Sequence, residues 1–535
     1  MASPRVSGTL TTVYILIAIT RPTNGCLKRG NSYFTFGKSD MVASVTNRLE
    51  EPASRENVLQ SSTSSSKISV NRQWMVDSYG RVRLFHGWNS VQKGVPWYTE
   101  EMINETKLDL YKSWGFNVVR LGCMWSGFEP TEGWYNETYI GIMKDIVKRL
   151  EQRGIYVIMD MHQDLMSTMF GNYDGIPLWI LKKFPPSPHR YPWPFRRGHF
   201  MTWTDGYLSQ AIGVAFQHLY NNYGHALDRM ARFWSKVATV FKDSANVLGY
   251  ELINEPWAGD IYSRPFLLEP GNAGRINLAP AYDKISNAIR LVDDRTLIFY
   301  EPVTWGIFLN GEHAGSGFDR VPGGPKYSNR SVLAYHYYCW LMDVSQQHRP
   351  FTFLQRTICD QIVGPKVFPA VLRDIARTKG SSFLTEFGAC EPDGHANSSA
   401  TVECDFVMRL ADQFLASWTY WDHAFFDEGG HVNWNVAGSF ARVYARAVSG
   451  TPRAMQYNVS DYNFFFSYQP DRKISQPTEI VIPEMHYRTG FQVRTSAGTK
   501  WTFDEKERIV KVYAENNTKQ TLITVVINRN SDHRN

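Results

Sequence analysis

The sequence predicts an α/β protein, a (β/α)8 TIM barrel followed by a C-terminal β-sandwich domain. Apolar runs that resemble buried strands alternate with helical stretches up to about residue 450, and shorter alternating strands follow. Two of the apolar runs, residues 252–256 and 383–388, carry a glutamate at their end, Glu255 and Glu386. The C-terminal tips of parallel barrel strands converge on one pocket, so these two carboxyl groups are expected to meet there.

Eight segments have the composition of strands, and helical segments lie between them. This order is the one expected of a (β/α)8 barrel. The strand candidates are rich in aliphatic and aromatic residues, whereas the helical stretches are longer and amphipathic. The predicted strands are residues 82–88, 117–121, 156–161, 247–253, 297–300, 332–337, 383–387 and 415–421, and the clearest predicted helices are residues 139–153, 226–242, 280–291 and 368–378.

The length of 535 residues exceeds one ordinary domain, although a barrel with insertions can take up about 400 of them. We therefore expect the barrel over residues 71–450 and a smaller module over residues 451–535. Short alternating strands separated by turn-forming residues are typical of a β-sandwich. The strands predicted in this module are residues 478–483, 491–495, 509–513 and 522–527.

The first 70 residues are not expected to belong to either domain. Arg5, the apolar stretch 13–19 and Arg21 together are typical of a secretory signal peptide, which we place over residues 1–25. A signal anchor is the alternative, but a bilayer crossing needs about 20 apolar residues. Residues 26–70 are polar and serine-rich, which predicts a flexible leader. The protein is thus expected to be secreted or lumenal, acting outside the cell or in the endolysosomal system.

Export predicts glycosylation and disulfide bonds. Of the six cysteines, Cys390 and Cys404 form the preferred pair and Cys339 and Cys359 the next. If the signal is cut after Cys26, at least one thiol stays free, and Cys123 beside a strand end is the candidate. Sequons for N-glycosylation begin at Asn104, Asn136, Asn329, Asn397, Asn458 and Asn516, somewhat more than random placement would give. The alternative is that half of them are accidental.

Composition excludes few functions. The formal charge of +6 arises from 57 basic and 51 acidic residues without a long basic run, so nucleic-acid binding is not expected, and weak attraction to anionic surfaces is allowed. An aromatic content of 14% suits sugar-binding surfaces, but a barrel core also absorbs many rings.

The two glutamates fit the chemistry of a retaining glycosidase. In such an enzyme a protonated carboxyl gives its proton to the leaving oxygen, and a carboxylate roughly 5 to 5.5 Å away attacks the anomeric carbon. We expect Glu255 to be the acid/base, since burial and a neighbouring anion raise the pKa of a carboxyl group. Asn254 beside it can bind the sugar 2-hydroxyl. Glu386 is then the expected nucleophile. The alternative is two glutamates on unrelated strand ends.

Other polar residues at strand ends are candidates for the same pocket. Arg120 can hold the nucleophile ionised, although a structural ion pair is the alternative. His336 and Tyr338, two positions apart, are expected to point the same way, and the tyrosine hydroxyl can donate to Glu386. A buried histidine with satisfied hydrogen bonds is the alternative for His336. Trp421 offers a floor for a pyranose ring, or else it belongs to the barrel packing.

Asp160, His162 and Asp164 alternate along the end of the third predicted strand, so they face the same way. Hydrogen bonding to sugar hydroxyls is the expected role. Zinc ligation is the rival interpretation, but no second histidine pair with ligand spacing is present in the sequence. No metal and no cofactor are therefore expected.

The order of these candidate residues along the chain resembles the pattern of glycoside hydrolase family 5. The family pattern has an arginine after strand two, a histidine after strand three, Asn-Glu-Pro after strand four, His-x-Tyr after strand six, a glutamate after strand seven and a tryptophan after strand eight. Residues 87–93, 160–164, 177–179 and 254–259 are similar to the animal-type endoglycoceramidases rather than to typical cellulases. The resemblance covers about residues 74–530.

This resemblance implies hydrolysis of the β-linkage between an intact oligosaccharide and ceramide in a glycosphingolipid. It also implies that Lys93, Asp164 and Trp179 contact the sugar. Two other functions stay open. One is a polysaccharide-cleaving endo-β-1,4-glucanase or mannanase with the same barrel and carboxyl pair. The other is an inactive carbohydrate-binding protein, which the complete carboxyl pair argues against.

The segment 171–224 is far longer than a normal loop of a barrel and interleaves aromatic with basic residues. We expect its rings to border a ceramide channel and its cations to favour acidic glycolipids or the surface of a membrane or micelle. The alternative is that the rings form a small core under an inserted helical lid. The residues concerned are Trp179, Ile180, Leu181, Phe184, Tyr191, Trp193, Phe195, Phe200 and Trp203, with Lys182, Lys183, Arg190, Arg196 and Arg197.

Overall fold

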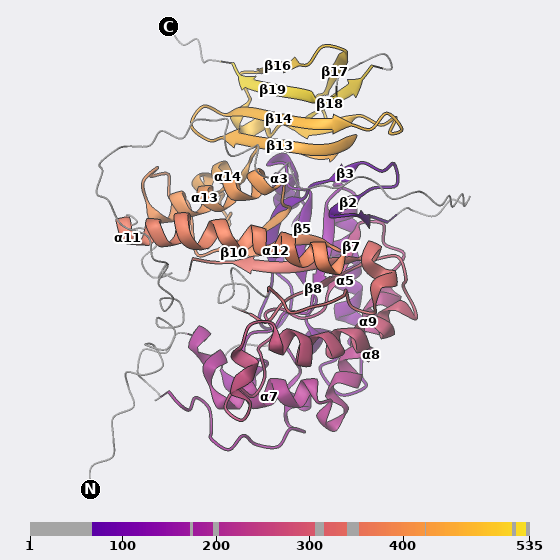
Figure 1. Cartoon of the computed structure of the whole chain (residues 1–535), viewed down its shortest axis with the longest axis vertical. Helices are drawn as coiled ribbons and strands as arrows, with labels where there is room; N and C mark the ends of the chain where they lie inside the picture. Colours follow the sequence, from indigo (N-terminus) through magenta and orange to yellow (C-terminus); the bar gives the residue numbers. More distant parts are fainter. Residues whose placement is uncertain are drawn as a thin grey trace, which may run out of the picture. The chain divides into compact units, whose positions relative to one another are not determined.

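The computed structural model describes residues 67–171, 175–195, 203–304, 315–339, 352–422, 424–515 and 521–530. Eight parallel strands close into a barrel in the order β10-β11-β4-β5-β6-β7-β8-β9, which confirms the predicted fold class. Strands β5, β7, β8 and β10 of this barrel are labelled in Figure 1. The predicted signal peptide, residues 1–25, and the predicted leader up to residue 66 lie outside the described residues. The barrel strands are β4 (His86–Ser90), β5 (Val118–Gly122), β6 (Tyr156–Asp160), β7 (Val247–Glu251), β8 (Leu297–Tyr300), β9 (Ser331–Tyr337), β10 (Ser381–Gly388) and β11 (Trp418–Trp421).

Helices follow the strands along the chain, and four of them match the predicted helices within a few residues. Local signals fix their ends, as at the start of α5, where the Asn136 side chain accepts a hydrogen bond from the Tyr139 backbone N–H. The α-helices of four residues or more are α3 (Glu105–Ser113), α4 (Trp125–Phe128), α5 (Glu137–Glu151), α6 (Leu178–Leu181), α7 (Gln210–Tyr220), α8 (Ala226–Phe241), α9 (Ala279–Arg290), α11 (Phe353–Arg356), α12 (Gly364–Thr378), α13 (Ser399–Phe414) and α14 (Trp434–Phe440).

The first predicted strand, residues 82–88, is in fact two strands in different sheets. Val82–Arg83 forms β3, which pairs with β12 (Tyr444–Val448), and the barrel strand begins only at His86. Gly87 is needed there, because a Cβ atom at this position would lie 1.7 Å from the carbonyl oxygen of Val118 on the neighbouring strand.

The C-terminal domain consists of two antiparallel sheets. A seven-stranded sheet has the order β1-β2-β3-β12-β15-β18-β17, and a four-stranded sheet has the order β13-β14-β19-β16. The predicted barrel range of 71–450 therefore includes strands at both of its ends that belong to this domain, and β1 already begins within the predicted leader. The remaining strands are β1 (Ser69–Asn71), β2 (Trp74–Val76), β13 (Gly450–Asn458), β14 (Asn463–Pro470), β15 (Thr478–Val481), β16 (Phe491–Thr495), β17 (Thr499–Asp504), β18 (Ile509–Ala514) and β19 (Ile523–Arg529).

The barrel strands change from apolar to polar along their length. Val118 on β5 and Ile158 on β6 belong to a buried apolar cluster with Phe299 on β8. Two positions further along the same strands, Arg120 and Asp160 are fully buried polar residues. Side chains two apart on a strand share a face, so an apolar layer supports a polar layer at the C-terminal ends of the strands.

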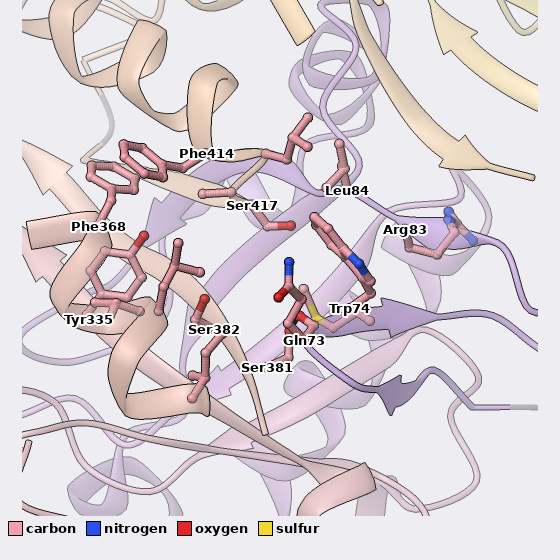
Figure 2. A pocket seen from close by; sticks show the side chains of 16 residues that line it. Gln73, Trp74, Arg83, Leu84, Tyr335, Phe368, Ser381, Ser382, Phe414 and Ser417 are labelled. Atoms are coloured by element: carbon pink, nitrogen blue, oxygen red, sulfur yellow. Dashed lines mark hydrogen bonds between the residues drawn. The ribbon is translucent and has the colours of Figure 1, made fainter. Parts of the chain in front are cut away.

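A cavity of about 30 Å³ lies at the opposite, N-terminal end of the barrel strands (Figure 2). Trp74, Tyr335, Phe368 and Phe414 line it together with small polar residues such as Ser417. A space of this size holds one or two water molecules rather than a sugar. The polar layer at the other end of the barrel is therefore the better candidate for a site.

Both predicted disulfide bonds are present, Cys390–Cys404 and Cys339–Cys359. Cys123 is a free buried cysteine among the described residues, and burial raises the pKa of its thiol, which makes it unreactive. Within the described ranges, the helices are all too short or too polar to cross a membrane.

Candidate active site

Arg120 on β5 is the centre of the polar layer. Its guanidinium donates to Glu251 Oε2 at 2.7 Å, to Glu386 Oε1 at 2.6 Å and to Asn254 Oδ1 at 2.8 Å. Burial would lower the pKa of Arg120, but the surrounding carboxylates, Asp160 first, raise it well above its usual value. A buried cation thus orients several carboxylates at once, including the predicted nucleophile.

Glu386 on β10 is held by donors at both carboxylate oxygens. Arg120 occupies Oε1, and the Tyr338 hydroxyl donates to Oε2 at 2.8 Å. The glutamate is 4% exposed. Charge-assisted hydrogen bonds of this kind favour the ionised carboxylate, which is the form that a nucleophile requires.

Glu255 follows β7, and its surroundings differ from those of Glu386. Burial raises the pKa of Glu255 to about 7, and the negative charge of Asp164 adds to this rise. Its φ of 41° lies in the left-handed region, which residues other than glycine seldom adopt. Glu301 Oε2 accepts the Glu255 backbone N–H at 3.1 Å. This carboxyl group is thus prepared to carry a proton near neutral pH.

His336 on β9 lies between the two glutamates. Its Nδ1 is 2.9 Å from Glu255 Oε1 and 3.4 Å from Glu386 Oε2. One carboxylate oxygen of each glutamate and a nitrogen of this ring lie within 4.8 Å of one another. The predicted pair is therefore brought together at a separation compatible with a retaining glycosidase.

A second group of polar side chains lies at the C-terminal end of β6. His162 Nδ1 is 2.8 Å from Asp160 Oδ2, and Asp164 forms an ion pair with Lys93. The His162 ring stacks on Trp421, with ring centroids 5.1 Å apart, and Lys93 Nζ lies 4.8 Å from the Trp421 ring centroid. The predicted residues Lys93, His162, Asp164 and Trp421 therefore form one cluster.

The charges in this cluster are matched. Burial would lower the pKa of His162, but Asp160 and Asp164 raise it to about 9. Burial opposes ionisation of Asp164, yet Lys93 and His162 hold its pKa well below the usual range. The imidazolium and the Lys93 ammonium can donate, and Asp164 can accept, which suits hydrogen bonding to the hydroxyl groups of a sugar.

Asn254 is fixed from both sides. Its Oδ1 accepts from Arg120, and its Nδ2 donates to the backbone carbonyl of Gln163 at 3.0 Å. The Gln163 side chain in turn donates to the carbonyl of Asn254 at 2.6 Å. The loop that carries Glu255 is thereby tied to the end of β6.

Three buried residues of the site were not predicted from the sequence. Asn89 accepts from Arg120 at 3.1 Å, Glu251 receives the Arg120 Nε–H, and Glu301 contacts both Glu255 and His336. One signal for Glu301 was available, since it follows a buried strand and precedes Pro302, just as Glu255 precedes Pro256.

Trp179 lies apart from this cluster in its described contacts. Its indole N–H donates to the Glu129 carbonyl at 3.0 Å, and its ring packs edge-on against Trp125. Its contact with sugar stays a prediction. In the same segment, Phe184 and Tyr191 pack against the main core, whereas Trp193 is 37% exposed. Phe200, Arg196 and Arg197 lie outside the described residues.

Comparison with known proteins places this site in a family. Residues 76–427 match the family model described as cellulase (glycosyl hydrolase family 5), and residues 442–527 match the glycoside hydrolase family 5 C-terminal domain. The chain belongs to glycosyl hydrolase family 5. This confirms the resemblance found in the sequence. The chain is therefore a glycoside hydrolase.

Among its relatives are two animal endoglycoceramidases. The protein of Cyanea nozakii is 35% identical over 479 residues, which are 82% of this chain and 89% of the relative. The protein of Hydra vulgaris is 34% identical over 497 residues, which are 85% of this chain and 89% of the relative. A structure of endo-glycoceramidase II from Rhodococcus sp. in a ganglioside GM3 complex has a similar fold, with a TM-score of 0.71 and 23% identity over 86% of this chain and 100% of that chain.

Proposed function

We propose that this glycoside hydrolase cleaves the β-glycosidic bond between the oligosaccharide and the ceramide of glycosphingolipids, with retention of configuration. The observation that carries the reaction type is the pair of glutamates whose carboxylate oxygens lie within 4.8 Å of each other in contrasting surroundings. Support for the lipid substrate comes from the animal endoglycoceramidases, to which the chain is similar over most of its length.

In the first step, a carboxylate oxygen of Glu386 forms a bond to the anomeric carbon while the bond from that carbon to the ceramide oxygen breaks. Glu255 gives its proton to the departing oxygen, so ceramide leaves as an alcohol. Arg120 and Tyr338 keep Glu386 ionised until the attack.

In the second step, Glu255 acts as a base. It takes a proton from a water molecule, whose oxygen bonds to the anomeric carbon as the bond to Glu386 breaks. The free oligosaccharide leaves with its original configuration, and both glutamates return to their starting protonation states.

The surface after β7 and β8 suits an apolar aglycone. Leu267 and Val303 lie on the two loops that follow Glu255 and Glu301, and the cavity that they border, about 40 Å³, is too small for a lipid chain, so the exposed side chains of these loops are the candidate surface. The neighbouring Phe266 and Leu268 are each 45% exposed. An apolar surface next to the proton donor is where a lipid leaving group is expected to lie.

Incubation with a ganglioside and mass analysis of the products tests the function. The expected products are free ceramide and the intact oligosaccharide. Cleavage of soluble β-glucan without release of ceramide would favour the endoglucanase or mannanase alternative. Bound but uncut glycolipid would favour the carbohydrate-binding alternative.

We further propose peripheral contact with the surface of membranes or micelles. The exposed Trp193, Lys182 and Arg190 support it, since an aromatic ring with flanking cations suits an anionic interface. Replacing Lys182 and Arg190 by alanine is expected to reduce turnover of ganglioside in micelles and to spare a soluble aryl glycoside. The matched control removes the exposed Lys473 and Lys506 of the C-terminal domain. Equal losses on both substrates would contradict the surface role.

A secreted or lumenal site of action is also proposed. The two disulfide bonds support it, as do the exposed sequons at Asn104, Asn329, Asn397 and Asn458. Expression in animal cells should yield protein in the medium or in vesicles whose mass falls on enzymatic removal of N-glycans. A cytosolic, unglycosylated product would contradict this proposal.

A further inference from the structure

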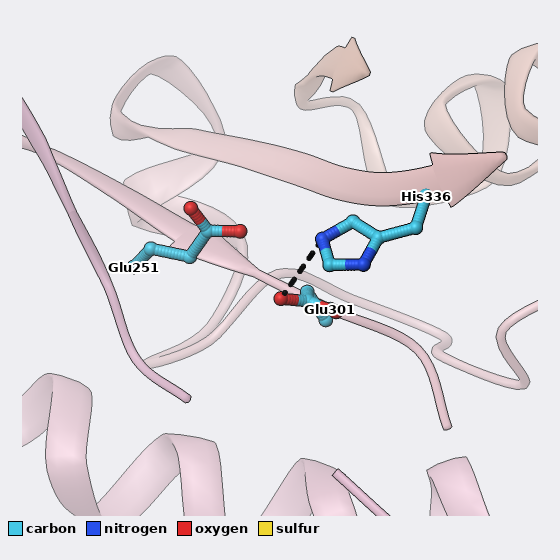
Figure 3. A group of neighbouring side chains, drawn as sticks. All are labelled: Glu251, Glu301 and His336. Carbon is cyan, nitrogen blue, oxygen red and sulfur yellow. Dashed lines mark ion pairs between the residues drawn. The ribbon is translucent and has the colours of Figure 1, made fainter. Parts of the chain in front are cut away.

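Glu251, Glu301 and His336 lie side by side at the ends of β7, β8 and β9 (Figure 3). One carboxylate oxygen of each glutamate and a ring nitrogen of His336 lie within 4.8 Å of one another. Glu251 already pairs with Arg120 Nε at 2.7 Å. Glu301 is 3% exposed, and the mechanism proposed above assigns it no part. Its role can be read from the hydrogen bonds of His336.

The His336 ring has one favourable tautomer. Its Nδ1 faces two acceptors, Glu255 Oε1 at 2.9 Å and Glu386 Oε2 at 3.4 Å, so this nitrogen carries the hydrogen. Burial lowers the pKa of His336 to about 4, which keeps the ring neutral. The other nitrogen, Nε2, therefore presents a lone pair.

That lone pair faces Glu301. His336 Nε2 and Glu301 Oε1 are 3.5 Å apart, and neither atom has a hydrogen-bond partner among the described residues. Two lone pairs in contact would repel each other, whereas a proton on Oε1 turns the contact into a hydrogen bond. The second oxygen, Oε2, accepts the Glu255 backbone N–H at 3.1 Å, which suits the carbonyl oxygen of a neutral carboxylic acid.

We propose that Glu301 is a positioning residue, held as a neutral carboxylic acid, that donates to His336 Nε2 and so fixes the ring with its Nδ1–H toward Glu255. The acid proton of Glu255 then stays on the oxygen that does not face His336, where it is available to the leaving group. The opposite tautomer would draw that proton into a hydrogen bond with the ring. Glu301 also holds the strained Glu255 backbone, whose φ is 41°.

The surrounding charges are consistent with a neutral Glu301. Burial and then the carboxylate of Glu251 raise the pKa of Glu301 well above its usual value, against the opposing charge of Arg120 at 3.5 Å. Glu255 and Glu386 add to the rise. From α9, the Tyr282 hydroxyl donates only to the Glu301 backbone carbonyl. When two carboxyl groups lie close together beside one cation, the state in which only one of them is ionised is favoured. Of Glu251 and Glu301, Glu251 is the one in direct contact with Arg120.

Substitution of Glu301 tests the proposal, which rests on the acid role of Glu255. Glu301→Gln keeps a donor for His336 and an acceptor for the Glu255 N–H, and it is expected to stay within roughly threefold of wild-type kcat on ganglioside. Glu301→Leu removes both and is expected to lose on the order of 10- to 100-fold. Glu251→Gln is the matched control, expected to lose more than Glu301→Gln because Arg120 loses a charged partner.

An activated aryl glycoside separates positioning from general damage, because its leaving group needs no proton. The loss of kcat in Glu301→Leu should be much smaller on this substrate than on ganglioside. The alkaline limb of its pH profile, which is the fall of kcat/KM at high pH, should also be altered. The proposal would be overturned if Glu301→Gln and Glu301→Leu lost the same factor in kcat on ganglioside. It would also be overturned if Glu301→Leu lost the same factor on ganglioside and on the aryl glycoside. If the leucine variant does not fold, Glu301→Gln decides alone: a loss beyond tenfold overturns the proposal, and a smaller one supports it. Glu255→Ala run in parallel shows separately whether the acid role itself fails.

Discussion

The two sides of the pocket place the same residue type in opposite surroundings. On the β10 side, Glu386 faces two donors, Arg120 and Tyr338, at 2.6 and 2.8 Å. On the β7 side, Glu255 faces a neutral histidine and lies near the carboxylate of Asp164, while its backbone N–H donates to the carboxyl group of Glu301. Donors stabilise a charge, whereas burial beside an anion stabilises a proton. Identical side chains thereby become suited to opposite halves of one reaction.

This contrast also shows how one cation serves a crowded site. Arg120 contacts Glu251 and Glu386 directly, and its contact with Glu301 is longer, at 3.5 Å. The charge of Arg120 opposes the rise in the pKa of Glu251 and of Glu301 that burial causes, but it cancels neither. Away from Arg120, Lys93 and His162 lower the pKa of Asp164, so the local cations and burial together set the proton affinity of each carboxyl group.

The largest expected effect comes from Glu386→Ala. Loss of the nucleophile should reduce kcat on the order of 10⁵-fold with ganglioside and with an activated aryl glycoside alike. Azide added to this variant can attack the anomeric carbon in place of the carboxylate, and a single displacement inverts that carbon. The expected product is the α-glycosyl azide, identified by NMR. Near wild-type turnover would exclude Glu386 as the nucleophile.

A smaller and more selective effect is expected from Glu255→Ala. Turnover of ganglioside should fall on the order of 10²- to 10⁴-fold, because ceramide is a poor leaving group without a proton. Bond cleavage in a dinitrophenyl glycoside should be largely spared, and azide should now give the β-glycosyl azide from the covalent intermediate. The wild-type kcat/KM should fall as pH rises through about 7, where Glu255 loses its proton, and the variant should lack this limb. An unchanged limb would assign it to another group.

The sequence predicted what the barrel geometry imposes locally. Because strand ends converge, Arg120, Glu255, His336 and Glu386 were expected to meet without knowledge of any tertiary contact. The short loop between Cys390 and Cys404 likewise made their bond predictable.

Two features depended on the tertiary structure. The role of Glu301 follows from the tautomer of His336 and from burial, and neither is encoded in a local pattern. Strand β3 has only two residues, too few for any periodicity, and its partner β12 lies far along the chain. Its place in the C-terminal domain was therefore not predictable from residues 82–88 alone.

The smallest expected effect is a shift of the alkaline limb in Asp164→Asn. The charge of Asp164 contributes to the raised pKa of Glu255, so its removal should lower that pKa and move the limb of kcat/KM to lower pH. Lys93→Met is the matched variant of opposite sign, because the cation lowers the pKa of Glu255 and its removal should move the limb to higher pH. Both variants should also raise KM if the pair binds sugar. Shifts in the same direction would show that the charges around Glu255 do not set its proton affinity.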